Sequence, residues 1–146
     1  MKVQKNFALP DRLLEARRQR GLSQGEAASN SRISQSMLCA FERGRRTPES
    51  QEALRRLCDA YGLDEAEWDE VWFLAQHDQL MLFMQGTDLA PAAEFISEML
   101  KTHRVMSSDE CRGLMVEMSA IRDSRLRTQD LARKARHQQE RESNMS

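Results

Sequence analysis

The chain has 146 residues, which is enough for one domain, or two small ones, with a real hydrophobic core. Hydrophobic residues make up 40% and charged residues 31%, and Val, Ile, Thr and Tyr are few, so a helix-rich globular protein is favoured. No apolar run approaches the ~18 residues of a membrane span, and the N-terminus lacks the apolar region of a secretory signal. The three cysteines are too scattered to indicate a disulfide framework or a zinc site. We therefore expect a cytoplasmic protein with no membrane contact, metal or cofactor.

Charge is distributed unevenly along the chain, although the formal net charge is only -1. Residues 1–48 carry ten Lys/Arg and four Asp/Glu, residues 49–121 carry five and fifteen, and residues 122–146 carry seven and four. The three segments therefore have net charges of +6, −10 and +3. A basic first segment followed by an acidic one indicates that the first segment meets a polyanion.

Two helices are predicted within the first 31 residues. The sequence LPDRLLEARRQRG places Pro10 at the start of the first helix and Gly21 just after its end. Ser23 then begins a second short helix, and Glu26 three residues later completes the pattern of a capping box.

Two more helices are predicted before residue 63. Ser34 is the expected N-cap of the third helix, and Gly44 follows its end. Thr47 is the expected cap of the fourth helix, with Pro48 in its first turn and Gly62 after its end. Four short helices in this segment predict a compact all-helical unit.

Longer helices are predicted after residue 63. LDEAEWDEVWFLAQHDQLMLFM reads as one helix, and apolar residues between 92 and 100 mark another. Ser107 and Glu110 form a capping box for the last helix. Its apolar stripe consists of Cys111, Leu114, Met115, Met118 and Ile121. From residue 127 the chain is a basic tail that we expect to be frayed or disordered.

Residues 21–48 read GLSQGEAASNSRISQSMLCAFERGRRTP, two short helices joined by a tight turn. The positions that carry a family pattern are Gly21, Leu22, Ser23, Gln24, Ala28, Ile33, Ser34, Glu42, Gly44 and Pro48. With them the segment resembles the helix-turn-helix of the Xre/Cro/CI family, the phage-repressor type, and the resemblance covers about residues 9–63. It implies a lambda-repressor-like bundle of four to five helices over residues 1–63. Two positions depart from the pattern: Arg32 stands where most members have Gly, and Ser31 replaces an apolar residue. The turn is therefore expected to be looser than usual.

The resemblance also implies roles for individual side chains. Arg17 and Glu42 would form a structural ion pair between the first and third helices. The third helix, at about residues 34–43, would be the recognition helix, which enters the major groove of DNA. Base contacts are expected from Gln35, Ser36, Met37, Cys39 and Ala40. Phosphate contacts are expected from Gln24, Arg43, Arg45 and Arg46.

Residues 64–126 are expected to form a helical dimerisation or partner-binding region, because a family member of this kind normally binds a palindromic operator as a dimer. The interface residues expected are Trp72, Leu80, Met81, Phe83, Met84, Phe95, Met99, Leu114 and Met118. The function implied is that of a dimeric transcriptional repressor. Because methionine-rich surfaces also adapt to other proteins, an antitoxin or adaptor that binds a toxin, an antirepressor or RNA polymerase is the alternative.

Other classes of function find no support in the residue pattern. No Ser/His/Asp or Cys/His arrangement, phosphate-binding loop or metal-ligand cluster indicates an enzyme. The basic segment has no interleaved aromatic residues of the kind that stack on RNA bases. Trp68 and Trp72 are interpreted as core residues, and His77 and His103 are given no role.

Overall fold

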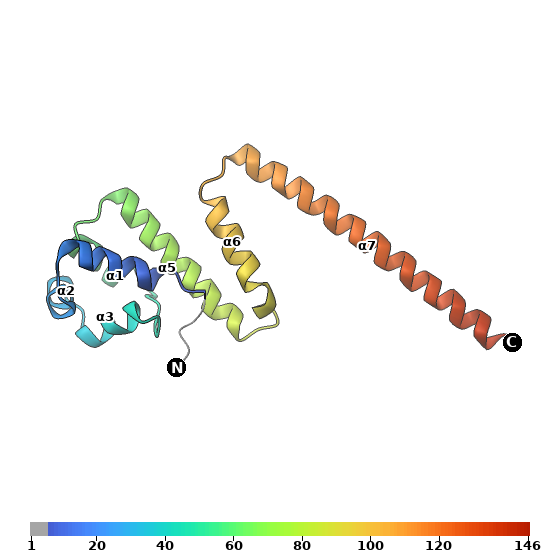
Figure 1. The fold of residues 1–146 in the computed structure, drawn as a ribbon, viewed down its shortest axis with the longest axis horizontal. Coiled ribbons are helices and arrows are strands. Elements are labelled where there is room, and N and C mark those ends of the chain that lie inside the picture. The colour runs from blue at the N-terminus through green and yellow to red at the C-terminus, as the bar shows by residue number, and fades with distance from the viewer. Residues whose placement is uncertain (1–5) are drawn as a thin grey trace. The chain divides into compact units, whose positions relative to one another are not determined.

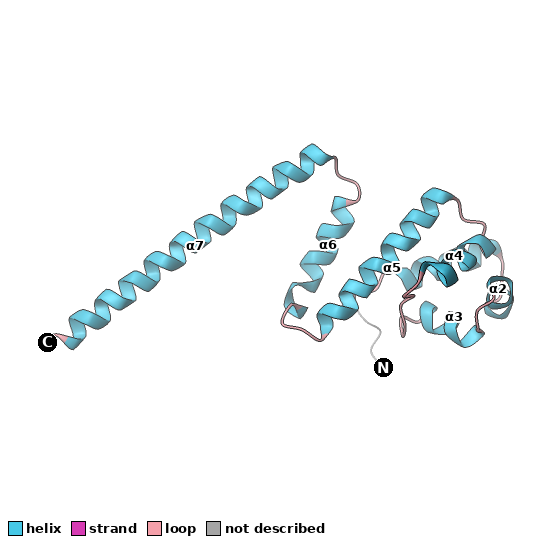
Figure 2. Ribbon diagram, turned by 180° about the vertical axis from the view of Figure 1, so that it is seen from behind, coloured by secondary structure: helices cyan, strands magenta, loops and turns pink. Residues whose placement is uncertain are grey.

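The computed structural model describes residues 6–146, and the first five residues of the predicted DNA-binding domain lie outside this range. The described residues form seven α-helices and one short 3₁₀ helix and contain no strand, so the predicted all-α class is confirmed. Figures 1 and 2 show these helices from two opposite sides. The chain divides into two compact units, one extending to Leu100 and the other beginning at Lys101.

The first unit begins with four short helices, as predicted. They are α1 (Leu9–Arg20), α2 (Gln24–Ser31), α3 (Gln35–Glu42) and α4 (Gln51–Ala60). The capping box between Ser23 and Glu26 is present, and Ser34 caps α3 by accepting a hydrogen bond from the Met37 amide. Gly21 and Gly62 follow α1 and α4 with φ of 72° and 70°, a left-handed conformation that glycine adopts without steric cost. Local sequence signals therefore set these boundaries.

A fifth helix, α5 (Glu65–Gln85), completes the bundle by packing against α1 and α4. Val71 and Ala75 of α5 are fully buried in the same apolar core as the first four helices. Arg12 of α1 also pairs with Glu67 and Glu70 of α5, at 3.5 and 3.2 Å. The bundle thus continues well beyond residue 63, where the sequence placed the domain boundary.

The start of the fourth helix differs from the prediction. α4 begins at Gln51 with Ser50 as its N-cap residue, not at Thr47. The Thr47 hydroxyl instead accepts a hydrogen bond from the Gln79 side-chain amide of α5, at 2.5 Å. The same amide donates to the Pro48 carbonyl at 3.2 Å. The Thr47 hydroxyl therefore bonds to a residue distant in sequence and does not cap the start of α4.

The end of α5 is covered by the next two elements, the 3₁₀ helix η1 (Ala90–Ala92) and α6 (Ala93–His103). Met81 and Met84 form a second buried cluster with Ala93 and are each about 1% exposed. The prediction that these two methionines lie in a dimer or partner interface was therefore wrong, because both side chains are buried within a single folded chain. The apolar run of residues 80–84 packs partly inside its own unit.

A buried polar network links α6, α5 and α1. The Asp78 carboxylate accepts hydrogen bonds from the backbone amides of Ala8 and Leu9, both at 2.9 Å. His77 Nδ1 lies 2.8 Å from Asp78 Oδ1, and its Nε2 lies 2.8 Å from the Ser97 hydroxyl of α6. Both the His77 and Asp78 side chains are fully buried. Asp78 thus caps α1, whose own N-cap residue, Ala8, has no side chain that could do so.

The second unit is dominated by α7 (Ser108–Asn144), a helix of 37 residues. The predicted capping box between Ser107 and Glu110 is present at its start. The tail expected to fray from residue 127 is instead the second half of this helix, which contains Asp130 paired with Lys134 four residues later at 2.9 Å. No residue of α7 is buried. None of the described helices is both long and apolar enough to cross a membrane.

Candidate nucleic-acid interface

The segment α2–turn–α3 is held tightly by small buried residues. Ala27 and Ala28 of α2 are buried, with exposures of 0% and 3%, and α2 packs against both α3 and α4. Leu38 and Phe41 anchor α3 in the same core. Small side chains allow close approach of two helices, so this arrangement fixes α3 relative to α2.

The turn between α2 and α3 accommodates both departures from the family pattern. Arg32 adopts φ 56° and ψ 40°, a left-handed conformation that usually favours glycine. The buried Ser31 hydroxyl donates back to the Ala27 carbonyl at 2.5 Å. Arg56 of α4 donates its Nε–H to the Ser31 carbonyl at 2.8 Å. The turn is thus tied to α4, a contact that the sequence analysis did not anticipate.

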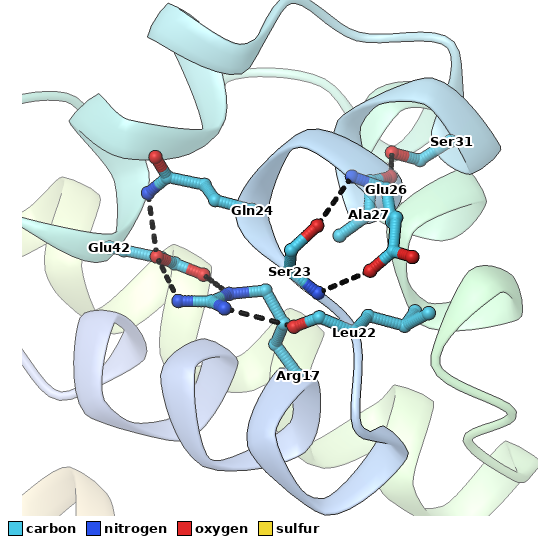
Figure 3. Close-up of polar contacts among 8 residues, drawn as sticks. All are labelled: Arg17, Leu22, Ser23, Gln24, Glu26, Ala27, Ser31 and Glu42. Atoms are coloured by element: carbon cyan, nitrogen blue, oxygen red, sulfur yellow. Dashed lines mark hydrogen bonds and ion pairs between the residues drawn. The ribbon is translucent and has the colours of Figure 1, made fainter.

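The ion pair implied between Arg17 and Glu42 is present and is the centre of a larger network (Figure 3). Arg17 Nε and Nη2 donate to the two Glu42 carboxylate oxygens, at 2.6 and 3.1 Å. Arg17 Nη1 donates to the Leu22 carbonyl, at 3.0 Å. The Glu42 hydrogen bond raises the pKa of Arg17 above its ordinary value. This bidentate pair ties the end of α3 to α1 and to the loop before α2.

Gln24 joins this network, although the sequence analysis expected it to contact a phosphate. Its side-chain amide donates to Glu42 Oε2 at 2.9 Å. An amide nitrogen carries two donor protons, so one remains for another acceptor. The backbone amide of Gln24 also lies in the first turn of α2, where amides lack an intrahelical acceptor.

The residues proposed to contact bases lie along α3 with different exposures. Gln35 and Ser36 are exposed at its start, whereas Met37, Cys39 and Ala40 are half-buried. Met37 packs against the core of the bundle. A side chain engaged in the core reaches less far into a groove, so the exposed start of α3 is the part best placed to meet a ligand.

Gln35 lies over the first turn of α2. A Cβ at Gly25 would lie 3.5 Å from Gln35 Oε1, which is an ordinary van der Waals contact. Ser36 shares a hydroxyl contact of 3.2 Å with Ser34, the cap of α3. The polar groups at the starts of α2 and α3 are therefore brought close together.

Three arginines follow the end of α3. Arg43, Arg45 and Arg46 are all exposed, and none has an acidic partner within residues 6–146. The backbone amides of Arg45 and Arg46 donate to the Ala40 carbonyl, at 2.9 and 3.3 Å. Gly44, which lies between Arg43 and Arg45, adopts φ 68°. The loop backbone is thus fixed while three guanidinium groups remain available to an anion.

The other predicted interface residues occupy two kinds of position. Leu80, Phe83, Phe95 and Leu114 are exposed, with 65% exposure for Phe83 and 61% for Phe95. Trp72, Met99 and Met118 are half-buried. Trp72 stacks on Trp68 with ring centroids 6.2 Å apart, and Arg55 lies 4.9 Å above the Trp68 ring.

The first part of the chain is similar to helix-turn-helix domains, a class of DNA-binding domain. Residues 8–71 match the family model described as a helix-turn-helix domain, so the match extends into α5, in agreement with the packing of that helix. Searches of curated proteins and of solved structures gave no match.

Proposed function

We propose that this protein is a sequence-specific, double-stranded DNA-binding transcriptional regulator of the Xre type. The observation that supports this most strongly is the combination found on α3. Its first residues are exposed and polar, three unpaired arginines follow its end, and the Arg17–Glu42 network fixes it to the bundle. The protein would be a cytoplasmic binding protein rather than an enzyme.

In this proposal α3 is the recognition helix. Gln35 is the principal reader, because a glutamine amide pairs with both N6 and N7 of adenine in the major groove. Ser36, Met37, Cys39 and Ala40 lie further along the same helix and supply permissive or apolar contacts. Arg43, Arg45, Arg46 and Gln24 contact phosphates, which adds affinity without sequence information.

We further propose that the protein is a dimeric repressor that binds a palindromic operator with half-sites ~34 Å apart. Leu80 and Phe83 of α5 and Phe95 of α6 are large apolar side chains left exposed in the first unit. Leu114 and Met118 lie on the apolar stripe of α7. Exposed apolar side chains that gather in this way mark interaction surfaces, and a second copy of the chain is the occupant we propose. Sedimentation that shows only monomer at high protein concentration would remove the dimer.

The test of the function is a binding titration against the DNA upstream of the gene, compared with random duplex, at several salt concentrations. Gln35→Ala should reduce discrimination between the two DNAs by ~1–3 kcal/mol. Arg43→Ala should weaken binding to every duplex and reduce the salt slope by about one for each bound protomer. Gln19→Ala in α1 and Arg127→Ala in α7 are the matched controls for Gln35→Ala and Arg43→Ala. They make the same substitutions at exposed positions outside the proposed interface, and so report any loss of binding caused by shortening a side chain alone.

Binding of the wild type to every duplex with the same affinity would contradict a sequence-specific regulator of its own promoter. Unchanged discrimination in Gln35→Ala would contradict the assignment of that residue as the reader. Loss of binding in Gln19→Ala as large as that in Gln35→Ala would point to a general effect on the bundle.

A protein partner is the alternative occupant of the exposed apolar side chains. The exposure of Phe83 and Phe95 supports it as well as it supports a second copy. Recovery of a stoichiometric toxin, antirepressor or polymerase subunit with the purified protein, together with a monomeric state when it is alone, would favour the antitoxin or adaptor role.

A further inference from the structure

One face of α7 changes from apolar to basic halfway along the helix. The first half presents Cys111, Leu114, Met115, Met118 and Ile121. The second half continues with Arg122, Arg125, Gln129, Arg133 and Arg136, at positions i, i+3, i+7, i+11 and i+14. At about 100° per residue these five side chains lie within an arc of about 80°, centred about 20° from the apolar set. α7 is one uninterrupted helix, so both sets lie along the same line (Figures 1 and 2).

This arginine face, defined as Arg122, Arg125, Gln129, Arg133 and Arg136, is exposed and contains no acidic residue. Glu140, the next residue on the same line, lies 3.5 Å from His137. Arg125 and Arg136 have no acidic partner in the described part of the chain. Arg122 lies 3.7 Å from Asp123, and Arg133 pairs with Asp130 at 2.7 Å. Both acids lie about 100° or more around the helix from the centre of the face. Exposed ion pairs of this kind are weak and exchange readily for a stronger anion.

The arginine face cannot continue an apolar packing seam. If a second copy packs in parallel on the stripe from Cys111 to Ile121, the same seam beyond Ile121 would place arginines of the two helices opposite each other. Like charges at facing positions are destabilising, so paired helices would separate where the arginines begin. The two halves of α7 therefore suit different ligands, and the basic half suits an anionic one.

The residue type indicates what kind of anion this is. Residues 122–146 contain six arginines and only one lysine. Lysine would keep a surface helix solvated as well as arginine does. The planar guanidinium group of arginine, however, binds a phosphate bidentately and keeps its charge at every physiological pH. The repeated positive charges along about 20 Å of helix match a polymer of phosphates better than a single small anion.

We propose that the arginine face of α7 is a second surface for double-stranded DNA, which grips backbone phosphates without reading sequence. The proposal rests on the proposed function in one respect: DNA is the polyanion that the helix-turn-helix domain is proposed to bind. The α3 helices supply discrimination between sequences, and α7 supplies additional affinity that depends strongly on salt.

The test compares two double variants of the full-length protein that remove the same charge from the same helix. Arg125→Gln with Arg136→Gln removes the two unpaired arginines of the face. Arg127→Gln with Arg141→Gln removes two arginines that lie elsewhere around the helix and also have no acidic partner in residues 6–146. Glutamine has a high helix propensity, and circular dichroism should show unchanged helicity in both.

The variant with Arg125→Gln and Arg136→Gln, called the face variant, should bind upstream and random duplex more weakly than the wild type does. Both affinities should fall by the same factor, so the ratio of the two affinities should not change. Losing two phosphate contacts in each protomer should make the salt slope shallower by ~1.8 per bound protomer. The deficit relative to the wild type should therefore grow by about tenfold per bound protomer between about 200 mM and about 50 mM salt. The variant at Arg127 and Arg141 should bind like the wild type.

Several outcomes would overturn the proposal. Equal weakening by both double variants would mean that only net charge matters, and no effect of either would mean that α7 does not touch DNA. Loss of binding to vesicles of anionic phospholipid, with DNA binding intact, would assign the face to a membrane surface instead. Failure of the proposed function is distinguishable: Gln35→Ala and Arg43→Ala would then have no effect on DNA binding, whereas the face variant would still weaken it.

Discussion

Replacing Asp78 with alanine tests whether the buried network that links α5 to α1 and α6 stabilises the first unit. The Asp78 carboxylate accepts from the amides of Ala8 and Leu9, each at 2.9 Å, and contacts His77 Nδ1 at 2.8 Å. Each buried donor left without a partner costs ~1–3 kcal/mol. Three groups would lose this acceptor: the Ala8 amide, the Leu9 amide and the His77 ring nitrogen. We therefore expect Asp78→Ala to lower the free energy of unfolding by about 3–5 kcal/mol.

The assay is urea unfolding followed by circular dichroism, with the m-value compared to establish that both proteins unfold in the same manner. Asp69→Ala is the matched control, because Asp69 is an exposed aspartate of the same helix with no partner in residues 6–146. An exposed substitution of this kind should change the free energy by less than ~0.5 kcal/mol. A loss below about 1 kcal/mol in Asp78→Ala would refute the reasoning, since it would mean that water satisfies the α1 amides equally well.

Three further predictions concern individual side chains. Arg17→Ala should lower the free energy of unfolding by ~3 kcal/mol, because it leaves the Glu42 carboxylate, 5% exposed, with Gln24 as its remaining side-chain donor; an unchanged midpoint in urea would contradict this. Arg32→Gly should be neutral or stabilise by up to ~1 kcal/mol, since relief of the left-handed conformation exceeds the added chain entropy of glycine; destabilisation by more than that in a melting experiment would argue against strain at the turn. Burial raises the pKa of the Cys58 thiol from 9.0 to about 12, so alkylation of the folded protein at neutral pH should spare Cys58 while the other two cysteines react. Because the unfolded thiol ionises first, the stability that Cys58 contributes should be complete below pH 9.0 and be lost as the pH rises toward about 12, and substitution of Cys58 by alanine should remove that part of the alkaline loss.

Features encoded by residues close in sequence were predictable. The capping boxes at Ser23 and Ser107, the N-cap at Ser34 and the glycine after α1 all depend on partners within three or four residues. For the same reason the sequence predicts the positions of α2 and α3, and hence of the candidate DNA-reading helix.

Features that depend on distant partners were not predictable from local pattern. Thr47 has the sequence pattern of a helix cap, but its hydroxyl accepts a hydrogen bond from Gln79, 32 residues away. His77 looks isolated in sequence, yet its second nitrogen meets Ser97 of another helix. Met81 and Met84 look like an exposed apolar run because nothing local shows that α6 covers them.

The second half of α7 was missed for a different reason. Its sequence has few apolar residues, and composition alone therefore favoured disorder. Helix formation there depends on an uninterrupted run without Pro or Gly after Gly113 and on pairs such as Asp130 with Lys134. A charge-rich composition does not distinguish such a helix from a frayed tail.

The capping of α1 by Asp78 has a consequence for how this protein could be divided or recombined. The first helix of the helix-turn-helix segment depends on the Asp78 carboxylate, which lies 69 residues after Leu9 in the sequence. A fragment that stops at residue 63, where the family resemblance ends, would lose that cap together with the α5 side of the core. The first four helices are therefore not a module that can be transplanted without α5. Gene fusions and evolutionary shuffling that preserve its fold must carry α5 at least through Asp78.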